Sequence, residues 1–446
     1  MSIRLPLPRR TRGPLAPLRD LLADFPRVVL VLAAGDLVAS FGFSLFFPFL
    51  TIYLVQDMGA AASEAGLAVA AYSLFSVGSG LAGGWLADRV GRRPVLIGSV
   101  SMSAMLVASM ALASEMWHVA LVMVLLGCVD PAFLPAARAA VADTVEEARR
   151  PRAFALLGVV SAMGWIAGPV IGAGLSSFGY PLLFGASGLL IGCYSLVAIR
   201  WLPETRPAVM PEAASPAAAD EPAGAAAVVT ADDPDAPVRR LVFAAFLPLL
   251  GSTHALTFLW VTTLPIYAAG GLRLPTPAWG ILFGLNGLII VLFQLRVSTA
   301  VEGRSKPMLI AGSMLLYAAG LGLVVLLTPE IAFIGLAATI TLITLGEILS
   351  TPVIPAFISD LSPIDRRGTY QGIAASAIGV GSAVGPPVAG LALDAAPGRA
   401  LWLAVAALLL GLGAGYALLA RYVAAHLPAR GPAFPGADGG RTAAIR

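Results

Sequence analysis

Four ionisable side chains lie inside long apolar segments of this sequence: Asp36, Asp130, His254 and Glu347. A charge at the centre of a bilayer costs about 2.5–3.5 kcal/mol on insertion scales, so such a residue normally faces a cavity and serves a function. Burial favours the protonated form of a carboxylate, and an approaching cation favours the ionised form. These residue types therefore predict exchange of protons for a cationic substrate. Structural pairing of each acid, and helix packing for His254, are the alternatives.

An internal repeat relates these residues to one another. The segment 127–173 aligns without a gap to 344–390, at a constant offset of 217 positions. Asp130 falls on Glu347, and Asp36 falls on the residue before His254. The expected helices 1, 4, 7 and 10 thus each carry a titratable group at nearly equal depth. Two parallel repeats with a substrate site between them near mid-membrane describe a secondary transporter.

The composition requires a membrane to hold these elements. Of 446 residues, 58% are hydrophobic and 12% are charged, whereas soluble domains carry about 25% charged residues. Apolar runs of about 20 residues are long enough to cross the hydrocarbon core. We expect an all-α membrane protein whose twelve transmembrane helices form two pseudo-symmetric bundles of six. The predicted spans are 27–55, 62–86, 94–113, 117–143, 153–176, 180–202, 240–268, 277–299, 307–327, 330–357, 368–392 and 399–424.

A polar segment, 203–239, divides the spans six and six. It is rich in Ala, Pro and Asp and has no helical hydrophobic period, which is typical of a linker. The prediction has an N-terminal arm (1–26), a first bundle (27–202), the linker, a second bundle (240–424) and a tail (425–446). Arginines concentrate in the connections on the side of the arm, linker and tail. The positive-inside rule therefore places both termini in the cytoplasm, with the protein in the cell (inner) membrane.

The sequence lacks the motifs that are typical of several other protein classes. Cys128 and Cys193 have no metal-ligand spacing, and we expect both to be free thiols. The formal charge of +3 comes from arginines at helix ends and forms no nucleic-acid stripe. The sequence has no P-loop and no Ser-His-Asp or zinc motif. We expect no enzyme, no metal and no cofactor, with a proton gradient as energy source and a monomer as the working unit.

A polar loop joins the second and third spans. It reads Gly84-Trp85-Leu86-Ala87-Asp88-Arg89-Val90-Gly91-Arg92-Arg93. Its first glycine permits close helix contact, its second allows a tight turn, and its aspartate can face a helix N-terminus. The loop resembles the signature of the major facilitator superfamily, in which Gly-x-Leu-Ala-Asp-Arg-x-Gly-Arg-Arg/Lys joins helices 2 and 3. The resemblance covers essentially the whole chain, including the twelve-span plan.

The resemblance implies a latch that closes the cytoplasmic side when the carrier is open outward. Asp88 would cap the start of helix 11, and Arg89 or Arg92 would pair with Asp143 at the end of helix 4. An ordinary topological anchor is the alternative. The implied latch residues are Gly84, Asp88, Arg89, Gly91, Arg92, Arg93 and Asp143.

Small residues and proline follow helical spacing in the fifth and eleventh spans. They are Gly164, Gly168, Pro169 and Gly172, and in the second half Gly381, Gly385 and Pro386. Such spacing gives a smooth, kinkable helix face. The first set resembles the helix 5 signature of drug–proton antiporters, with Ala173 in place of the usual second glycine. Pro203-Glu204-Thr205 similarly resembles the end of helix 6 in drug exporters. Generic tight packing is the alternative for the glycines.

The expected cavity is acidic and aromatic. Helix 1 offers Phe41, Phe43, Phe46, Phe47 and Phe49, and helix 7 offers Phe258 and Trp260. The nearest helix 4 arginine, Arg138, is about 12 Å from Asp130 by helical rise. Carboxylates and aromatic faces suit lipophilic cations, so the leading hypothesis is a proton-coupled exporter of small lipophilic, cationic compounds.

One residue departs from the exporter pattern. Met123 stands where drug exporters of the superfamily commonly carry a helix 4 arginine, which leaves the proton route open. Two alternatives to the exporter are a proton-coupled uptake symporter for a peptide or metabolite and a non-transporting membrane receptor or scaffold.

Overall fold

The computed structural model is nearly all helical, and it describes residues 25–146, 149–205, 235–363, 366–396 and 398–427. The predicted arm, linker and tail lie almost wholly outside the described residues. Within the described part, twelve helical segments are long and apolar enough to cross a membrane. All twelve predicted spans are present, with ends shifted by a few residues, so the predicted fold class is confirmed.

The first six spans are built from α2 to α8. Their bounds are α2 (Arg27–Gln56), α3 (Ala62–Val90), α4 (Arg92–Ser109), α5 (Met116–Val129), α6 (Phe133–Thr144), α7 (Arg150–Ser176) and α8 (Tyr180–Trp201). The remaining six are α9 (Ala236–Thr257), α10 (Leu259–Thr262) and α11 (Leu264–Gly270) as one broken span, α12 (Thr276–Ala300), α13 (Lys306–Leu323), α14 (Ala332–Ser350) with α15 (Val353–Leu361), α16 (Arg367–Ala395) and α17 (Gly398–His426).

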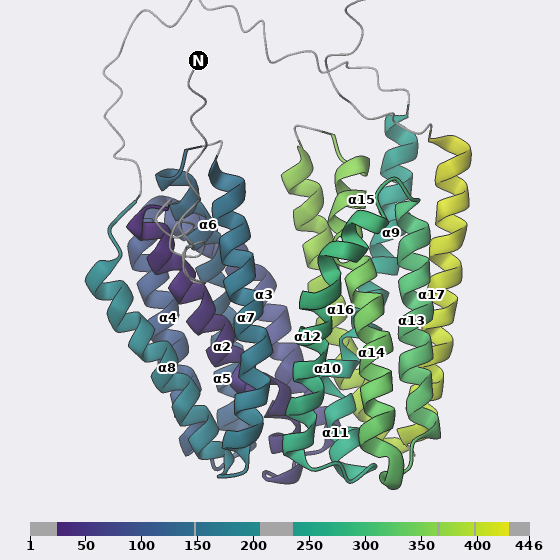
Figure 1. Cartoon of the computed structure of the whole chain (residues 1–446), viewed down its shortest axis with the longest axis horizontal. Coiled ribbons are helices and arrows are strands. Elements are labelled where there is room, and N and C mark those ends of the chain that lie inside the picture. The colour runs from purple at the N-terminus through teal and green to yellow at the C-terminus, as the bar shows by residue number, and fades with distance from the viewer. Residues whose placement is uncertain (1–24, 147–148, 206–234, 364–365, 397, 428–446) are drawn as a thin grey trace, which may run out of the picture.

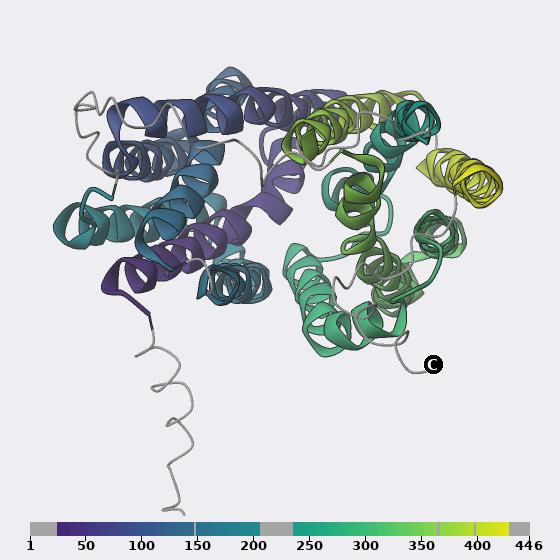
Figure 2. The ribbon, with the colours of Figure 1, turned by 90° about the horizontal axis from the view of Figure 1, so that it is seen from above.

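The two groups of helices stand side by side as two bundles (Figure 1). The end of α8 and the start of α9 lie at the same face, at the top of Figure 1, which we call the linker face. The opposite face is called the far face. Helices α3 and α16 pack along each other and join the bundles at one edge (Figure 2).

Spans 4 and 10 are both broken beside an acid. After α5, a 3₁₀ turn at Asp130–Ala132 precedes α6, and it contains Pro131, which has no backbone N–H to continue the ladder. In span 10, a turn that contains Pro352 separates α14 from α15 shortly after Glu347. Broken helices are where transporters of this architecture commonly place their binding groups.

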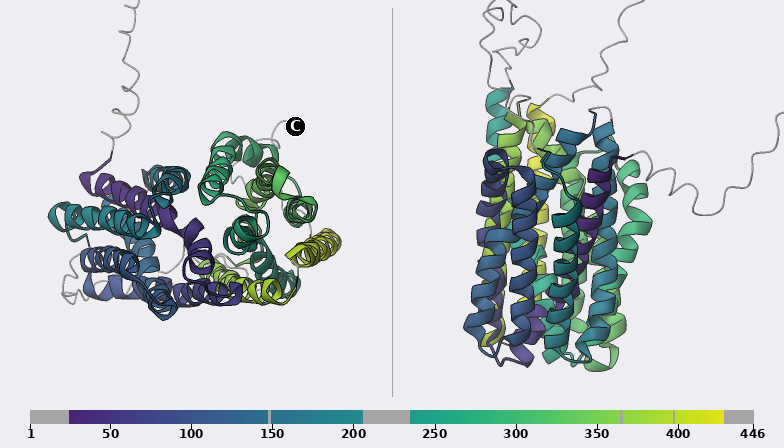
Figure 3. Two further views of the ribbon diagram at one scale, coloured as in Figure 1. Left: turned by 90° about the horizontal axis from the view of Figure 1, so that it is seen from below. Right: turned by 90° about the vertical axis from the view of Figure 1, so that its left-hand side faces the viewer.

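The bundles are closed against each other at the far face. The Asp394 carboxylate, at the end of α16, accepts hydrogen bonds of 3.0 Å each from the backbone N–H groups of Ala62 and Ser63, at the start of α3. A Cβ atom added at Gly66 would collide with the backbone of Pro386, so these two helices meet at backbone distance. The view from below shows this edge, with α3 and α16 side by side (Figure 3).

Candidate substrate cavity and acid pockets

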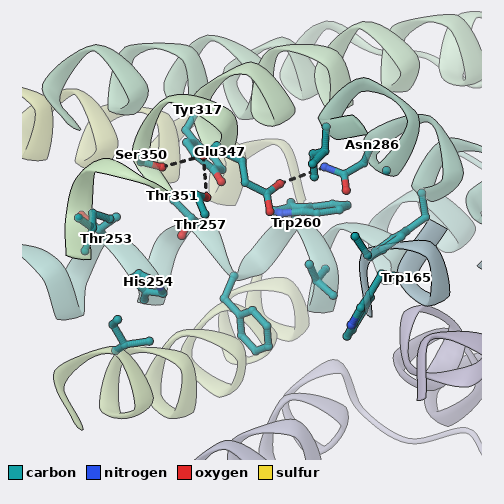
Figure 4. A pocket seen from close by; sticks show the side chains of 18 of the residues that line it. Trp165, Thr253, His254, Thr257, Trp260, Asn286, Tyr317, Glu347, Ser350 and Thr351 are labelled. Carbon is teal, nitrogen blue, oxygen red and sulfur yellow. Dashed lines mark hydrogen bonds between the residues drawn. The ribbon is translucent and has the colours of Figure 1, made fainter. Parts of the chain in front are cut away.

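A cavity of about 720 Å³ lies between the two bundles. Phe47 and Trp165 line it from the first bundle, and Trp260, Asn286 and Glu347 line it from the second (Figure 4). Its lining continues through residues of α7 and α15 that lie nearer the linker face. The far face is closed, so the cavity extends toward the linker face. Its volume is within the range of small-molecule sites.

Glu347 is held against an aromatic wall. The Asn286 side-chain amide donates hydrogen bonds to Glu347 Oε2 at 3.0 Å and to Thr344 Oγ1 at 2.9 Å. Trp260 stacks on Phe283 with ring centroids 4.8 Å apart. Within the described residues, Asn286 is the one side chain hydrogen-bonded to the Glu347 carboxylate. The second carboxylate oxygen, Oε1, therefore has no protein donor in the described part of the chain.

His254 lines the same cavity without touching Glu347 in the described structure. Its Nδ1 lies 3.3 Å from the Leu250 carbonyl oxygen of its own helix. Its neighbour Thr253, the repeat equivalent of Asp36, exchanges a hydrogen bond of 3.0 Å with Tyr416. The helix contact fits the packing role foreseen for His254, and a role in coupling stays a prediction.

A second cavity, of about 300 Å³, lies inside the first bundle and is lined by Asp36 and Asp130. Tyr72 Oη in α3 donates to Asp130 Oδ2 at 3.2 Å, and Ser103 Oγ in α4 donates to Oδ1 at 3.4 Å. Both oxygens of Asp130 are thus occupied by donors from neighbouring helices. We call this space the N-bundle pocket.

The structure separates the four titratable groups that the sequence places at nearly equal depth. Glu347 and His254 line the central cavity, whereas Asp36 and Asp130 line the N-bundle pocket. Helical rise gives the depth of a residue along the membrane normal but not the face on which it lies. The 3₁₀ turn at Asp130 directs its carboxylate toward α3 and α4, away from the second bundle.

A third cavity, of about 410 Å³, connects Asp36 with residues nearer the linker face, including Arg138 and Phe154. The sequence placed Arg138 far from the acids by helical rise, but the structure puts it in one cavity with Asp36. Ser161 lines all three cavities, and its Oγ lies 2.7 Å from Ser40 Oγ. The side of α7 that carries Ser161 and Trp165 thus forms the wall between the N-bundle pocket and the central cavity.

The motif 84–93, predicted as a loop, forms the end of α3 and the start of α4, with Gly91 between them, and it is bound within the first bundle. The predicted pair of Arg92 with Asp143 is present, with Nε 3.1 Å from Oδ2. Arg92 also pairs with Asp88, whose side chain is 68% exposed. The backbone N–H groups of Arg92 and Arg93 donate to the Glu204 carboxylate at 2.9 and 3.2 Å. Arg89 lies over the Trp85 ring, 4.3 Å from its centroid.

The cap of Asp88 on helix 11 is not formed in this conformation. Within the described residues, Asp88 pairs with Arg92, and no hydrogen bond or ion pair joins its side chain to the start of α16. A contact between bundles at the linker face is incompatible with a cavity that extends to that face. The latch function of the loop stays a prediction for the opposite conformation.

The second bundle contains an ion pair that corresponds to the Arg92–Asp143 pair of the first. Lys306, at the start of α13, forms an ion pair with Asp360, near the end of α15. Arg92 and Asp143 occupy the corresponding ends of α4 and α6. The repeat offset of 217 aligns Asp143 with Asp360, whereas the residues around Lys306, 301–306, do not keep the motif of residues 84–93.

The glycine motifs bring helices together within each bundle. Cβ atoms at Gly164, Gly168 and Gly172 would collide with α2, and those at Gly381 and Gly385 would collide with α9. The Ser44 hydroxyl donates to the Gly164 carbonyl at 2.9 Å across the first of these contacts. Tight packing thus accounts for both glycine sets. Pro169 lies against Gly280 of the second bundle, whereas Pro386 lies against Gly66 of the first.

The comparison with known families agrees with this architecture. The profile of the Major Facilitator Superfamily matches residues 32–349 and 303–444, in two overlapping segments. The chain belongs to the major facilitator superfamily. Members of this superfamily are membrane transporters and not enzymes, so this chain is a multi-pass membrane transporter of a small solute.

Two relatives and one solved structure show what the chain is similar to. It is 33% identical to the multidrug resistance protein MdtH of Cronobacter sakazakii over 159 residues, which covers 36% of this chain and 40% of MdtH. It is 25% identical to a Na(+), Li(+), K(+)/H(+) antiporter of Planococcus maritimus over 388 residues, 82% of this chain and 89% of the antiporter. A crystal structure of the peptide transporter POT in complex with sulfate superposes with a TM-score of 0.70 at 17% identity, covering 89% of this chain and 96% of that chain. That likeness shows the fold alone.

Proposed function

We propose that this transporter exports small lipophilic, mainly cationic compounds in exchange for protons, by alternating access. The observation that carries the proposal is the Glu347 carboxylate, set in the aromatic wall of a 720 Å³ cavity between the bundles. A carboxylate attracts a cation, and aromatic faces add cation–π attraction that grows when water is removed. The cavity lining has no arginine or lysine in the described residues, so an anionic substrate would lack a partner.

Exchange of protons for substrate fits the acids that the helices bury. Asp36, Asp130 and Glu347 line cavities inside the helical region, where an uncompensated charge is costly. A carboxylate that is protonated when the substrate is absent, and ionised when a cation binds, would couple the two flows. The likeness to MdtH and to the Planococcus antiporter supports efflux and antiport.

Outward transport requires the linker face to be cytoplasmic, and we propose this orientation in the cell (inner) membrane. The arginine-rich connections that contain Arg92, Arg149, Arg239 and Arg367 all lie at the linker face, as the positive-inside rule requires of the cytoplasmic side. The central cavity would then be open to the cytoplasm, where a drug-like cation would enter it.

Transport by purified protein in proteoliposomes tests the proposal. Ethidium and tetraphenylphosphonium serve as lipophilic cations, with a neutral compound of similar size as comparison. We expect an imposed proton gradient to drive cation accumulation against its gradient, and the protonophore-treated sample to show none. Substrate movement in the same direction as protons would instead support an uptake symporter, and absence of flux for any solute would support a receptor or scaffold.

Exchange of alkali cations for protons is a second candidate. The likeness to the Na(+), Li(+), K(+)/H(+) antiporter favours it, as does the N-bundle pocket, in which oxygen atoms of Asp36, Asp130, Tyr72 and Ser103 gather. Oxygen ligands are those that hard cations prefer. Proteoliposomes with a pH-sensitive dye would show alkalinisation on addition of Na⁺ or K⁺ if this candidate holds, with no need for a lipophilic cation.

A further inference from the structure

The two acid-lined spaces differ in size, lining and access, and these differences assign them different tasks. We propose that Glu347 alone binds the cationic group of the substrate, while Asp36 and Asp130 form a separate proton site that the substrate never enters. The inference rests on the proposed function, because it divides the work of the same transport cycle. It assigns a distinct role to two acids, Asp130 and Glu347, that the sequence repeat treats as equivalent.

The Glu347 site has an open ligand position. Asn286 occupies Glu347 Oε2, and Oε1 has no protein donor within the described residues. Asn286 is itself fixed by Thr344, so the carboxylate is held in one orientation beside the Trp260–Phe283 stack. A partly satisfied carboxylate in a 720 Å³ apolar cavity suits an ammonium or another organic cation with an attached hydrophobic body.

Asp130 in the N-bundle pocket has no comparable open position. Both oxygens of Asp130 accept hydrogen bonds, from Tyr72 and Ser103, in a space of about 300 Å³. A drug-sized molecule would have to displace these bonds and separate α3, α4 and α5, which pack closely around them. Hydroxyl groups and small polar spaces instead suit protons and water molecules.

The route that leads to Asp36 and Asp130 also favours a proton over an organic cation. The third cavity leads from Asp36 toward the linker face, and the Arg138 guanidinium lines it. A fixed positive charge in this passage repels a cationic substrate, whereas a proton can pass along water and hydroxyl groups without a cation entering. The titratable and charged side chains that face the acid pair are Tyr72 from α3, Arg138 from α6 and Tyr194 from α8.

Only one thin wall divides the two sites. Ser161 and Trp165, on one side of α7, line both spaces. Each contacts a residue of α2: Ser161 Oγ lies 2.7 Å from Ser40 Oγ, and the Trp165 ring centroid lies 5.9 Å from that of Phe43. A substrate that displaces Trp165 would therefore shift α7 against α2, the helix that carries Asp36. Coupling between the sites therefore needs no shared carboxylate.

The experiment compares Glu347→Gln with Asp130→Asn in the full-length protein. Three quantities are measured for each variant: the Kd for ethidium, ethidium counterflow between equilibrated compartments, and uphill accumulation driven by a proton gradient. Counterflow needs binding and alternating access but no net proton movement. We expect Glu347→Gln to raise Kd about tenfold or more, because a direct charge partner of the substrate is lost, and to abolish all transport of the cation.

We expect Asp130→Asn to leave Kd and counterflow within about threefold of the wild type, while uphill accumulation is lost. Asp36→Asn, in the same pocket, should behave likewise, and Asp130→Glu should restore accumulation because it returns a group that carries a proton. Thermal melting of each variant identifies loss of fold, and a misfolded Asp130→Asn is replaced by Asp36→Asn.

Equal loss of ethidium affinity in Asp130→Asn and Glu347→Gln would overturn the division of roles. Full proton-driven accumulation by an Asp36→Asn, Asp130→Asn double variant would overturn it as well. Failure of the proposed function has a different signature, because the wild-type protein itself would then bind and transport none of the lipophilic cations.

Discussion

The contact of Asp394 with the start of α3 predicts how the transporter chooses between its conformations. Two hydrogen bonds of 3.0 Å link this carboxylate, in the second bundle, to Ala62 N and Ser63 N in the first. The contact lies at the closed far face and must break when that face opens. Asp394→Asn keeps the size of the side chain but removes its charge and one of its two acceptor atoms, so it should favour opening of the far face.

The magnitude follows from the kind of contact. Replacing a side chain that caps a helix N-terminus by Ala costs about 0.5–2 kcal/mol. Asn keeps one acceptor and therefore part of this contribution, whereas the lost charge is worth about 0.3–1 kcal/mol at an exposed position. Asp394 is exposed, which favours the lower part of these ranges. A loss of about 0.5–1.5 kcal/mol from one conformation shifts its population ratio about 2–13-fold.

Electron–electron distance measurements between spin labels can detect such a shift. The labels replace Phe178, which is 81% exposed, and Glu330, which is also exposed, one at the far face of each bundle. Cys128 and Cys193 are first replaced by serine, because both are free thiols at the surface of their helices. We expect Asp394→Asn to increase several-fold the fraction of molecules in which the two labels are far apart, which is the fraction with an open far face.

Glu64→Gln is the matched control for this prediction. Its carboxylate also accepts a hydrogen bond at the start of α3, from Ala61 N at 2.9 Å, but that contact lies within the first bundle. The control should leave the distance distribution near that of the wild type. If Asp394→Asn gave the same distribution as Glu64→Gln, the contact between bundles would have no weight in the equilibrium, and the reasoning would be wrong.

Two further predictions concern stability. Gly168→Ala should lower the melting temperature, because its Cβ would collide with Ser44 and with the α2 backbone, and overpacking of this kind costs about 1–3 kcal/mol. Gly174→Ala is the control and should leave the melting temperature unchanged, because its Cβ would meet nothing within 4 Å. Equal melting temperatures of the two variants would contradict the packing argument. Arg92→Met should destabilise more than Lys306→Met, because the Arg92 side chain is 11% exposed and that of Lys306 is 32% exposed, and exposed ion pairs contribute only about 0–1 kcal/mol. Differential scanning fluorimetry of both variants decides this, and a larger effect of Lys306→Met would show that burial does not set the value of these pairs.

The fold could be predicted from the sequence because its signals are local and additive. Each span needs only a sufficiently long apolar run, and polar loops with glycine, proline or arginine mark the ends. The repeat supplied the relation between the two halves, including the match of Asp143 with Asp360. In the structure these two aspartates form corresponding ion pairs, with Arg92 and with Lys306, but the sequence motif around Lys306 differs from that around Arg92, so the second pair was not predicted.

The arrangement of the site could be predicted only in part. Depth along a helix follows from residue counting, and so Glu347 and Asp130 were recognised as buried acids. The face on which each acid lies depends on local breaks such as the 3₁₀ turn at Asp130 and on partners from other helices. Asn286 was missed because a single amide belongs to no motif or repeat. Its position, a polar side chain inside an apolar span, could have identified it.

The two acids of the repeat show how a duplicated architecture acquires direction. Asp130 and Glu347 occupy equivalent positions in the repeat, although Asp130 lies within a helix break and Glu347 lies shortly before one. In the first bundle, Tyr72 and Ser103 occupy both carboxylate oxygens and keep the acid inside the bundle. In the second, Asn286 occupies one oxygen and leaves the acid at the wall of the central cavity. A symmetric pair would offer substrate and proton the same two sites, whereas these unequal partners separate the acid that we propose binds the substrate from the acid that we propose carries the proton.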